Sequence, residues 1–282
     1  MGVPMPALPY CSQRKTKMYP GIEIFGRTIS SYGIAATIGI LFAIFVPYFL
    51  AKKRGLDEIR MLFLMLITFA SSLIGSHLLY GIVNYKLIIT AVNNLDRIDS
   101  FQTLIDWIVE IFGGAVFYGG LITGLLGGWI YIKRTEKNPA PYIDMGATAI
   151  PLFHGFGRIG CFLSGCCYGV PSACGVTFHN SLIESANNVS RFPVQLAESA
   201  LNFLLFLLLL TLFKKRKAQG KLMLLYLLIY PTYRFILEFF RGDEYRGFIG
   251  VLSTSQVISL LLFIFALIML AVRSMRTDTT EK

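Results

Sequence analysis

Near the end of one apolar segment, three charged residues recur at helical spacing. Arg234, Glu238 and Arg241 stand at positions i, i+4 and i+7, so they share one face if the segment is a helix. An arginine near the centre of a membrane-spanning helix costs about 2.5–3.5 kcal/mol, so such a face must meet a partner helix or water. Two interpretations are open: a structural ion pair between Arg234 and Glu238, and a site that binds an anion.

A second apolar segment repeats this spacing. His154, Arg158 and Cys161 again stand at i, i+4 and i+7. A planar guanidinium group binds phosphate through two hydrogen bonds, so Arg158 and Arg234 on facing helices predict a site for a lipid phosphate. A histidine in the position of His154 more often packs at a helix interface than it takes part in catalysis. His154 is nevertheless a candidate general base.

The elements that would hold these side chains are predicted from long apolar blocks. The 282 residues are 55% hydrophobic and 15% charged, with a mean hydropathy of +0.62, whereas soluble domains carry about a quarter charged residues. Seven blocks are long enough to cross about 30 Å of hydrocarbon. These blocks are 30–51, 61–83, 111–132, 143–163, 194–213, 222–240 and 255–272. The sequence therefore predicts an all-α polytopic membrane protein, with an amphipathic interfacial helix at 101–111.

Basic residues predict the orientation of these spans. The net charge of +10 is not spread along a nucleic-acid-binding surface, since the basic residues cluster in short loops between apolar blocks. The richest loops alternate along the chain, at 52–60, 133–137, 214–221 and 273–282. The positive-inside rule places these loops in the cytoplasm. We expect one integral-membrane domain, 1–282, in the bacterial inner membrane, with segment 1–28 outside and tail 273–282 in the cytoplasm.

Glycines are frequent in two of the predicted spans. In the third span, Gly124, Gly127 and Gly128 are typical of close helix packing through small residues. In the fourth span, Gly157 and Gly160 flank Arg158, where a missing side chain also lets backbone approach a ligand.

Five segments, in order along most of the chain, resemble the prolipoprotein diacylglyceryl transferase family. They are Ser31-Tyr32-Gly33, Gly113 to Gly120, Gly157-Arg158-Ile159-Gly160 with Phe162, Gly165 and Gly169, Arg191 to Glu198, and Arg234 to Arg241 followed by Leu252 to Gln256. Each segment alone is moderately specific, but five in order on a chain with seven spans strongly favour membership of this family.

The resemblance implies transfer of a diacylglyceryl group from phosphatidylglycerol to the lipobox cysteine thiol of a prolipoprotein signal peptide at the outer leaflet, with release of glycerol phosphate. The partners would be membrane lipid and the signal peptide, without nucleic acid, and the chain would act as a monomer without metal or cofactor. Arg158 and Arg234 would stabilise the phosphate that leaves, and Glu238 and Tyr118 are the other residues expected to be catalytic. The residues expected to contact substrate are Tyr32, His154, Cys161, Gly169, Gln195, Glu198, Tyr230 and Arg241.

The chain departs from the family pattern at four positions. Tyr118 stands where the family usually has a histidine that is favoured for thiol activation. Because an unperturbed tyrosine has a pKa near 10, Tyr118 could act as a base only as a phenolate held by arginine; otherwise the thiol is activated in another way. Cys161, Cys166 and His77 replace a usual asparagine, acidic residue and arginine.

Four clustered cysteines allow further interpretations. The spacing of Cys161, Cys166, Cys167 and Cys174 is irregular for a zinc site, which usually shows paired C-x₂₋₄-C motifs. A disulfide from Cys174 to Cys166 or Cys167, a covalent lipid relay, and simple packing of small side chains also remain open, and we favour packing. Two functions therefore compete with the main one: a lipid transferase of the same fold with another acceptor, and a non-enzymatic membrane protein built on the cysteines.

Overall fold

The computed structural model describes residues 14–24, 26–94, 100–181, 183–243 and 247–280. The chain divides into two compact units, one formed by Met1–Val46 with Ile143–Lys282 and the other by Pro47–Tyr142. Each unit is described separately below.

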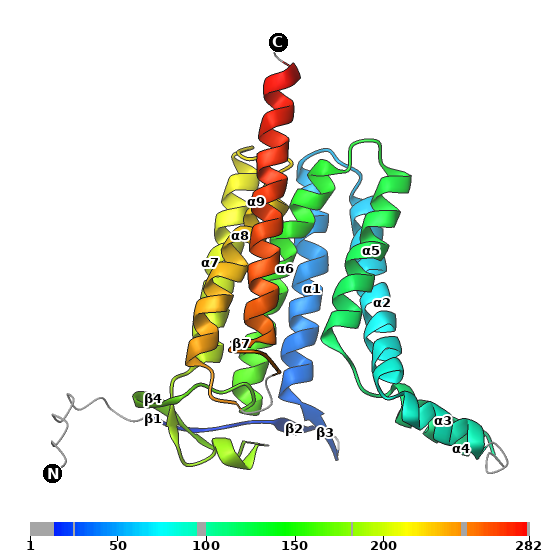
Figure 1. Ribbon diagram of the computed structural model, residues 1–282, viewed down its shortest axis with the longest axis vertical. Helices are drawn as coiled ribbons and strands as arrows, with labels where there is room; N and C mark the ends of the chain where they lie inside the picture. The colour runs from blue at the N-terminus through cyan, green and yellow to red at the C-terminus, as the bar shows by residue number, and fades with distance from the viewer. Residues whose placement is uncertain (1–13, 25, 95–99, 182, 244–246, 281–282) are drawn as a thin grey trace. The chain divides into compact units, whose positions relative to one another are not determined.

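Helices make up most of both units (Figure 1). Their bounds are α1 (Ser31–Lys53), α2 (Glu58–Val83), α3 (Tyr85–Asn93), α4 (Phe101–Phe112), α5 (Phe117–Thr135), α6 (Ala140–Ser164), α7 (Val194–Lys214), α8 (Leu222–Leu237) and α9 (Thr254–Thr280). Two 3₁₀ turns, η2 (Glu184–Ala186) and η3 (Glu238–Phe240), complete the helical elements of the described residues.

Five of these helices are long and apolar enough to cross a membrane. They are Ser31–Lys53, Glu58–Val83, Val194–Lys214, Leu222–Phe240, which includes η3, and Thr254–Arg273. A mostly helical, multi-pass membrane protein is thereby confirmed. The other two predicted spans, 111–132 and 143–163, coincide in part with α5 and α6, which are helices but do not belong to that set of five. Helix α4 confirms that the predicted amphipathic segment is helical.

The unit Pro47–Tyr142 is held together by close packing of α2 against α5. A Cβ atom on Gly124 would lie 3.1 Å from the Cβ of Ser72, and one on Gly127 would lie 2.8 Å from the Cβ of Ser71. The hydroxyl of Thr123 donates a hydrogen bond of 2.7 Å to the carbonyl of Ser71. Small residues on both helices therefore allow backbone contact, which confirms the packing role expected for the glycines of the third span.

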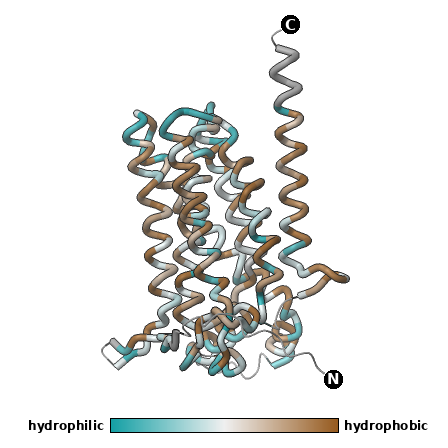
Figure 2. The backbone as a smooth tube through the Cα atoms, turned by 90° about the vertical axis from the view of Figure 1, so that its left-hand side faces the viewer, coloured by the Kyte–Doolittle hydropathy of each residue, from teal (hydrophilic) through white to brown (hydrophobic). Residues whose placement is uncertain are grey.

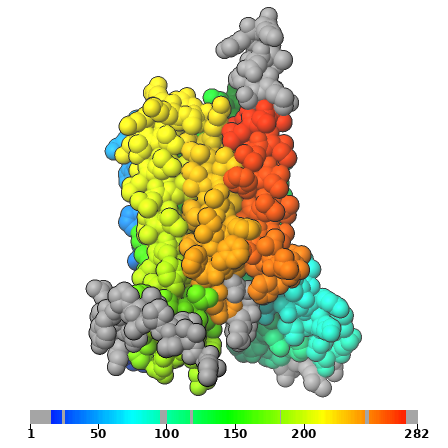
Figure 3. Space-filling view, turned by 60° about the vertical axis from the view of Figure 1, so that its left-hand side comes forward, coloured from blue at the N-terminus to red at the C-terminus, as the bar shows by residue number. Residues whose placement is uncertain are grey.

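In the other unit, α7, α8 and α9 lie side by side in chain order (Figure 3). Their outer surfaces are apolar, as Figure 2 shows along α9. Leu204 of α7 and Leu261 of α9 are each 61% exposed. Such large exposed apolar side chains suit a hydrocarbon surrounding, because a monomeric soluble protein rarely exposes long apolar faces.

Short strands connect the helices of this unit, which the all-α expectation did not include. The strands are β1 (Arg14–Lys17), β2 (Gly21–Ile24), β3 (Arg27–Ser30), β4 (Pro171–His179), β5 (Ser190–Arg191), β6 (Phe248–Ile249) and β7 (Leu252–Ser253). Strand β4 pairs in parallel with β1 and antiparallel with β5, while β2–β3 and β6–β7 are hairpins. The side chains of Met18, Tyr168 and Phe178 form a buried cluster beside the three-stranded sheet. This sheet fixes the segment that joins α6 to α7.

A capping box fixes the start of α9. The backbone N–H of Gln256 donates to the hydroxyl of Ser253, and the backbone N–H of Ser253 donates to the side-chain oxygen of Gln256. The two residues thus satisfy each other's backbone groups at the helix N-terminus. This arrangement sets the position of the neighbouring Ser255, which contacts the site described next.

Candidate active site

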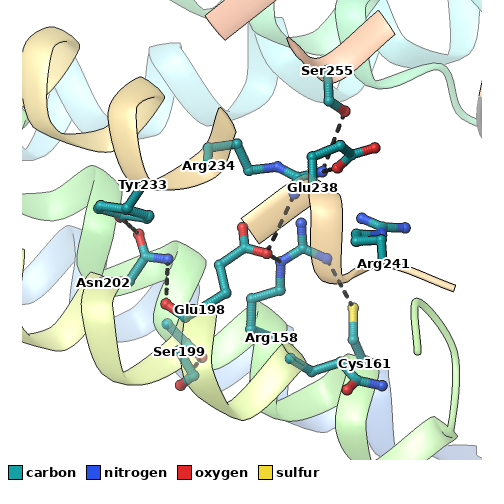
Figure 4. A network of polar contacts seen from close by, with 12 residues as sticks. Arg158, Cys161, Glu198, Ser199, Asn202, Tyr233, Arg234, Glu238, Arg241 and Ser255 are labelled. Atoms are coloured by element: carbon teal, nitrogen blue, oxygen red, sulfur yellow. Dashed lines mark hydrogen bonds and ion pairs between the residues drawn. The ribbon is translucent and has the colours of Figure 1, made fainter. Parts of the chain in front are cut away.

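A buried glutamate joins the two arginines singled out in the sequence (Figure 4). Glu198 of α7 lies with one carboxylate oxygen 3.0 Å from Nε of Arg158 on α6 and 3.9 Å from Nη1 of Arg234 on α8. Glu198 is only 2% exposed. Residues from three helices therefore converge, as the prediction of facing charged stripes required, but with a carboxylate between the guanidinium groups.

A second carboxylate completes the cluster. Nη2 of Arg234 lies 2.8 Å from Glu238 and also donates a hydrogen bond of 3.2 Å to the hydroxyl of Ser255. The ion pair between Arg234 and Glu238 is therefore present, as one interpretation expected. Two positive and two negative side chains balance each other, which is how buried charges become tolerable in an apolar surrounding.

The cluster keeps hydrogen-bond donors available for a ligand. Among the described residues, Nη1 of Arg234 is buried without a hydrogen-bond partner, since its distance to Glu198 is too long for one. The side chain of Arg158 is 20% exposed, against 8% for Arg234. Arg158 therefore presents the accessible edge of the cluster, and Arg234 lies behind it with one donor unused. A phosphate group that enters past Arg158 would find donors on both arginines.

Polar residues of α7 hold Glu198 in place. The hydroxyl of Tyr233 donates to Asn202, whose amide nitrogen donates to the carbonyl of Glu198, at 2.9 and 2.8 Å (Figure 4). The hydroxyl of Ser199 donates a hydrogen bond of 2.8 Å to the carbonyl of Gly155 on α6. These bonds tie α7 to both arginine-bearing helices, so the carboxylate position is set by the surrounding helices as well as by the arginines.

Arg241 does not lie on the same helical face as Arg234 and Glu238, and that part of the prediction is wrong. Helix α8 ends at Leu237, and the chain leaves helical structure before Arg241, which forms a β-bridge with Gly169. Asp243 accepts two hydrogen bonds from Arg241, at 2.8 and 2.5 Å. Burial lowers the pKa of Arg241, but these bonds and the charge of Asp243 outweigh burial and hold the pKa above its ordinary value.

Gly169 is required by backbone packing. A Cβ atom at this position would overlap the carbonyl oxygen of Phe192 and lie 3.0 Å from the carbonyl oxygen of Phe240. The carbonyl of Gly169 accepts a hydrogen bond of 3.3 Å from Arg191, whose guanidinium carbon lies 4.2 Å from the ring centroid of Tyr168. Gly169 therefore lies where the segment before α7 meets the segment after α8, and these contacts leave no room for a side chain.

We expect Gly169→Ala to lower the free energy of unfolding by about 1–3 kcal/mol, because overpacking forces backbone to move. Denaturant titration of the protein in detergent micelles measures this change. Gly157→Ala is the matched control, because a Cβ at Gly157 meets no atom within 4 Å. A Gly169→Ala protein as stable as the Gly157→Ala protein would contradict the packing assignment.

The aromatic candidates surround the cluster. The ring of Tyr230 lies 5.2 Å from the ring of His154, centroid to centroid, and 5.4 Å from that of Tyr233. Nδ1 of His154 is buried without a hydrogen-bond partner among the described residues. Tyr32 is the second residue of α1. It packs against Gly160 of α6, because a Cβ atom on Gly160 would lie 3.1 Å from the Cα of Tyr32. Tyr230 and Tyr32 therefore both border α6, the helix that carries His154 and Arg158.

Gln195 and Cys161 link the cluster to the cysteine segment. The amide nitrogen of Gln195 donates a hydrogen bond of 2.8 Å to the carbonyl of Cys166. Nη1 of Arg158 lies 4.0 Å from the sulfur of Cys161. Gln195 is 1% exposed, so the structure gives it a positioning role beneath the site.

Tyr118 belongs to α5 and therefore to the unit Pro47–Tyr142. Its side chain lies outside the described part of the chain. In the same unit, Nδ1 of His77 lies 2.8 Å from the carbonyl oxygens of both Phe112 and Gly114. A ring nitrogen that faces two acceptors must carry a hydrogen, so Nδ1 of His77 is the donor to these carbonyl groups.

Five polar residues of the site were not among the sequence candidates: Ser199, Asn202, Tyr233, Asp243 and Ser255. Asn202 could have been found, because Gln195, Glu198, Ser199 and Asn202 recur at helical spacing within an apolar span. Asp243 and Ser255 carry no such signal, because Asp243 follows η3 outside regular helix and Ser255 lies in the first turn of α9, 21 residues from Arg234.

Comparison with known proteins shows the family of this chain. The family model described as prolipoprotein diacylglyceryl transferase matches residues 21–272. A phosphatidylglycerol–prolipoprotein diacylglyceryl transferase of Clostridium tetani is 36% identical over 247 residues, which are 87% of this chain and 93% of that protein. One from Clostridium perfringens, named transferase 2, is 33% identical over 264 residues, which are 92% and 98% of the two chains. This chain therefore belongs to the prolipoprotein diacylglyceryl transferase family.

Proposed function

We propose that this chain transfers a diacylglyceryl group from phosphatidylglycerol to the lipobox cysteine thiol of a prolipoprotein. The observation that carries the proposal is the convergence of Arg158 and Arg234 on one buried carboxylate, in a chain that belongs to this family. The relatives described above are named for both substrates. Lipid and signal peptide are thus the proposed partners.

In the proposed reaction, a sulfur atom attacks a glycerol carbon and a phosphate ester leaves. The leaving phosphate gains negative charge, which the guanidinium groups of Arg158 and Arg234 stabilise in a site shielded from water. Glu238 holds Arg234 in position from behind. Tyr32, Tyr230 and His154 border the space beside Arg158, where they can contact the glycerol or the acceptor. Tyr118 can serve as the base only as a phenolate.

Complementation tests this function directly. A strain depleted of its own diacylglyceryl transferase should regain lipoprotein maturation when it expresses this chain, as read by lipoprotein mobility on gels. In vitro, vesicles of phosphatidylglycerol and a lipobox peptide should yield a diacylglyceryl thioether, whereas the peptide with serine in place of cysteine should not. If the strain grew without any change in lipoprotein mobility, and the chain transferred lipid to some other acceptor, the result would instead support a different lipid transferase of the same fold.

We further propose that the chain is one integral-membrane domain in the bacterial inner membrane, with seven spans and a cytoplasmic C-terminus. The positions of α5 and α6 support the two additional spans, and the basic loops support the orientation.

A green fluorescent protein fused after Lys282 is expected to fluoresce, because that reporter folds in the cytoplasm. An alkaline phosphatase fused at the same place is expected to be inactive. The reverse pattern would contradict the proposed orientation.

A further inference from the structure

Three cysteine sulfurs gather beside the arginine cluster. Cys161 stands in the last turns of α6, and Cys166 and Cys167 follow the end of that helix. The sulfur atoms of these three residues all lie within 4.8 Å of one another. Within the described residues, none of the three forms a disulfide, and Cys174 on β4 is not part of the group. The fold therefore assembles a group of three thiols from a spacing that did not favour a metal site.

A tight turn after α6 builds this group. Gly165 has a φ of +74° and ends the helix, and a Cβ there would overlap Ser181. Cys167 also adopts a left-handed conformation, with a φ of 54°. The backbone N–H of Cys166 donates to the carbonyl of Cys161, and Gln195 donates to the carbonyl of Cys166. The turn brings Cys166 and Cys167 back to Cys161, and the hydrogen bond from Gln195 of α7 holds the turn in place.

The geometry of the three sulfurs fits a soft metal ion. Zinc binds thiolate sulfur at about 2.3 Å in a tetrahedron, which sets sulfur atoms about 3.8 Å apart, and the three sulfur atoms observed here all lie within 4.8 Å of one another. Thiolate ligands select zinc over magnesium or calcium. Three protein ligands with one open position are typical of catalytic zinc sites, whereas structural sites use four.

The surroundings connect the group with the proposed reaction. Nη1 of Arg158 lies 4.0 Å from the sulfur of Cys161, while Nε of the same residue pairs with Glu198 (Figure 4). One arginine thus borders both the sulfur group and the place proposed for the phosphate. A thiolate held at the sulfur group would stand next to the phosphate ester that it must displace.

We propose that Cys161, Cys166 and Cys167 hold a zinc ion whose open position binds and activates the acceptor thiol. This inference rests on the proposed function for the identity of the thiol. It also offers a route to the thiolate that does not depend on Tyr118, because an unperturbed tyrosine has a pKa near 10. A dication stabilises the thiolate form of a ligand sulfur at neutral pH.

The atoms of this step balance without a redox change. The acceptor sulfur displaces water from the open position, and its proton passes to water. The sulfur electron pair then forms a bond to the glycerol carbon, and the bond from that carbon to the phosphate oxygen breaks. The released electron pair leaves on glycerol phosphate beside Arg158 and Arg234. The neutral thioether is a weaker ligand than a thiolate, so the product can depart.

Metal content is the first test. The full chain, purified in detergent without chelator, should contain about one zinc ion per chain. The variant with Cys161→Ser, Cys166→Ser and Cys167→Ser should lose it, and the matched control Cys174→Ser should keep it. Zinc removal from the wild-type chain by a chelator, followed by return of zinc or of magnesium, avoids any folding defect of the triple variant. Only zinc should bind again at the three cysteines and restore lipid transfer.

Acceptor binding is the second test. With cobalt in place of zinc, thiolate ligation gives an absorption band in the near ultraviolet and visible bands that report coordination. A lipobox peptide should shift these bands, whereas the peptide with serine in place of cysteine should leave them unchanged. This readout does not depend on transfer.

The outcomes separate the two proposals. A chain that transfers lipid but binds no zinc, or in which two of the three cysteines resist alkylation until they are reduced because they form a disulfide, would overturn the zinc site and leave the proposed function standing. Zinc binding with a cobalt response to the cysteine peptide, but without transfer from phosphatidylglycerol, would support the thiol site and refute the proposed function. Loss of transfer in Tyr118→Phe with zinc still bound would assign thiol activation to the phenolate and overturn the activation step.

Discussion

Arg158→Ala is expected to reduce diacylglyceryl transfer by about 10²–10³-fold, the usual effect of removing one group that stabilises developing negative charge. Arg158 is the more accessible of the two arginines, and it alone contacts both Glu198 and the sulfur of Cys161. Its loss removes the donor nearest to the leaving phosphate. Transfer of labelled diacylglyceryl to a lipobox peptide in phosphatidylglycerol vesicles measures the effect.

This variant should remain folded. Without Arg158, Glu198 still lies 3.9 Å from Nη1 of Arg234, which has no hydrogen-bond partner among the described residues and can move to pair with it. Arg158→Lys keeps the charge but loses the planar fork, so we expect a smaller loss of transfer than with alanine. Arg134→Ala, at an exposed arginine of α5, is the control and should transfer at the wild-type rate. Wild-type transfer by a folded Arg158→Ala protein would exclude Arg158 from the phosphate site.

Most helix bounds could be predicted from sequence to within about three residues; the start of α5 at Phe117 and the end of α9 at Thr280 differ more, and α3 was not predicted. For example, the predicted span 194–213 is observed as Val194–Lys214. This accuracy has a physical reason: a bilayer selects continuous apolar blocks of nearly fixed length, so one short window of sequence carries most of the signal. That Arg158 would lie near Arg234 followed from the same reasoning, because charges in apolar helices must find partners, although the residue that joins them is Glu198 of α7.

What could not be predicted depends on turns and on distant backbone. Arg241 leaves the helical face because the chain after Leu237 pairs with the segment at Gly169, which lies far away in sequence. The sulfurs of Cys161 and Cys166 meet because Gly165 reverses the chain between them, and no spacing rule for metal ligands includes that turn. The sequence does not distinguish Glu198 from Gln195, because only the structure shows which side of α7 faces both arginines.

Glu198→Gln is expected to damage both stability and activity. The change keeps the shape of the side chain but removes one negative charge, so Arg158, Arg234 and Glu238 would share a net positive charge in a buried place. Breaking a buried ion pair in this way costs about 3–5 kcal/mol of unfolding free energy. Denaturant titration in micelles measures the cost, with Glu184→Gln, at an exposed glutamate of η2, as the matched control.

The double variant Arg158→Met, Glu198→Met separates the structural role of the pair from the catalytic one. It removes one charge of each sign and leaves the pair of Arg234 with Glu238 intact. Well-packed apolar replacements for a buried ion pair are often neutral for stability, so the double variant should recover most of the stability that Glu198→Met alone loses. Transfer should nevertheless stay as low as in Arg158→Ala, because the phosphate donor is gone. If the stable double variant transferred lipid, the ion pair would be a structural element only, and catalysis would have to lie elsewhere in the chain.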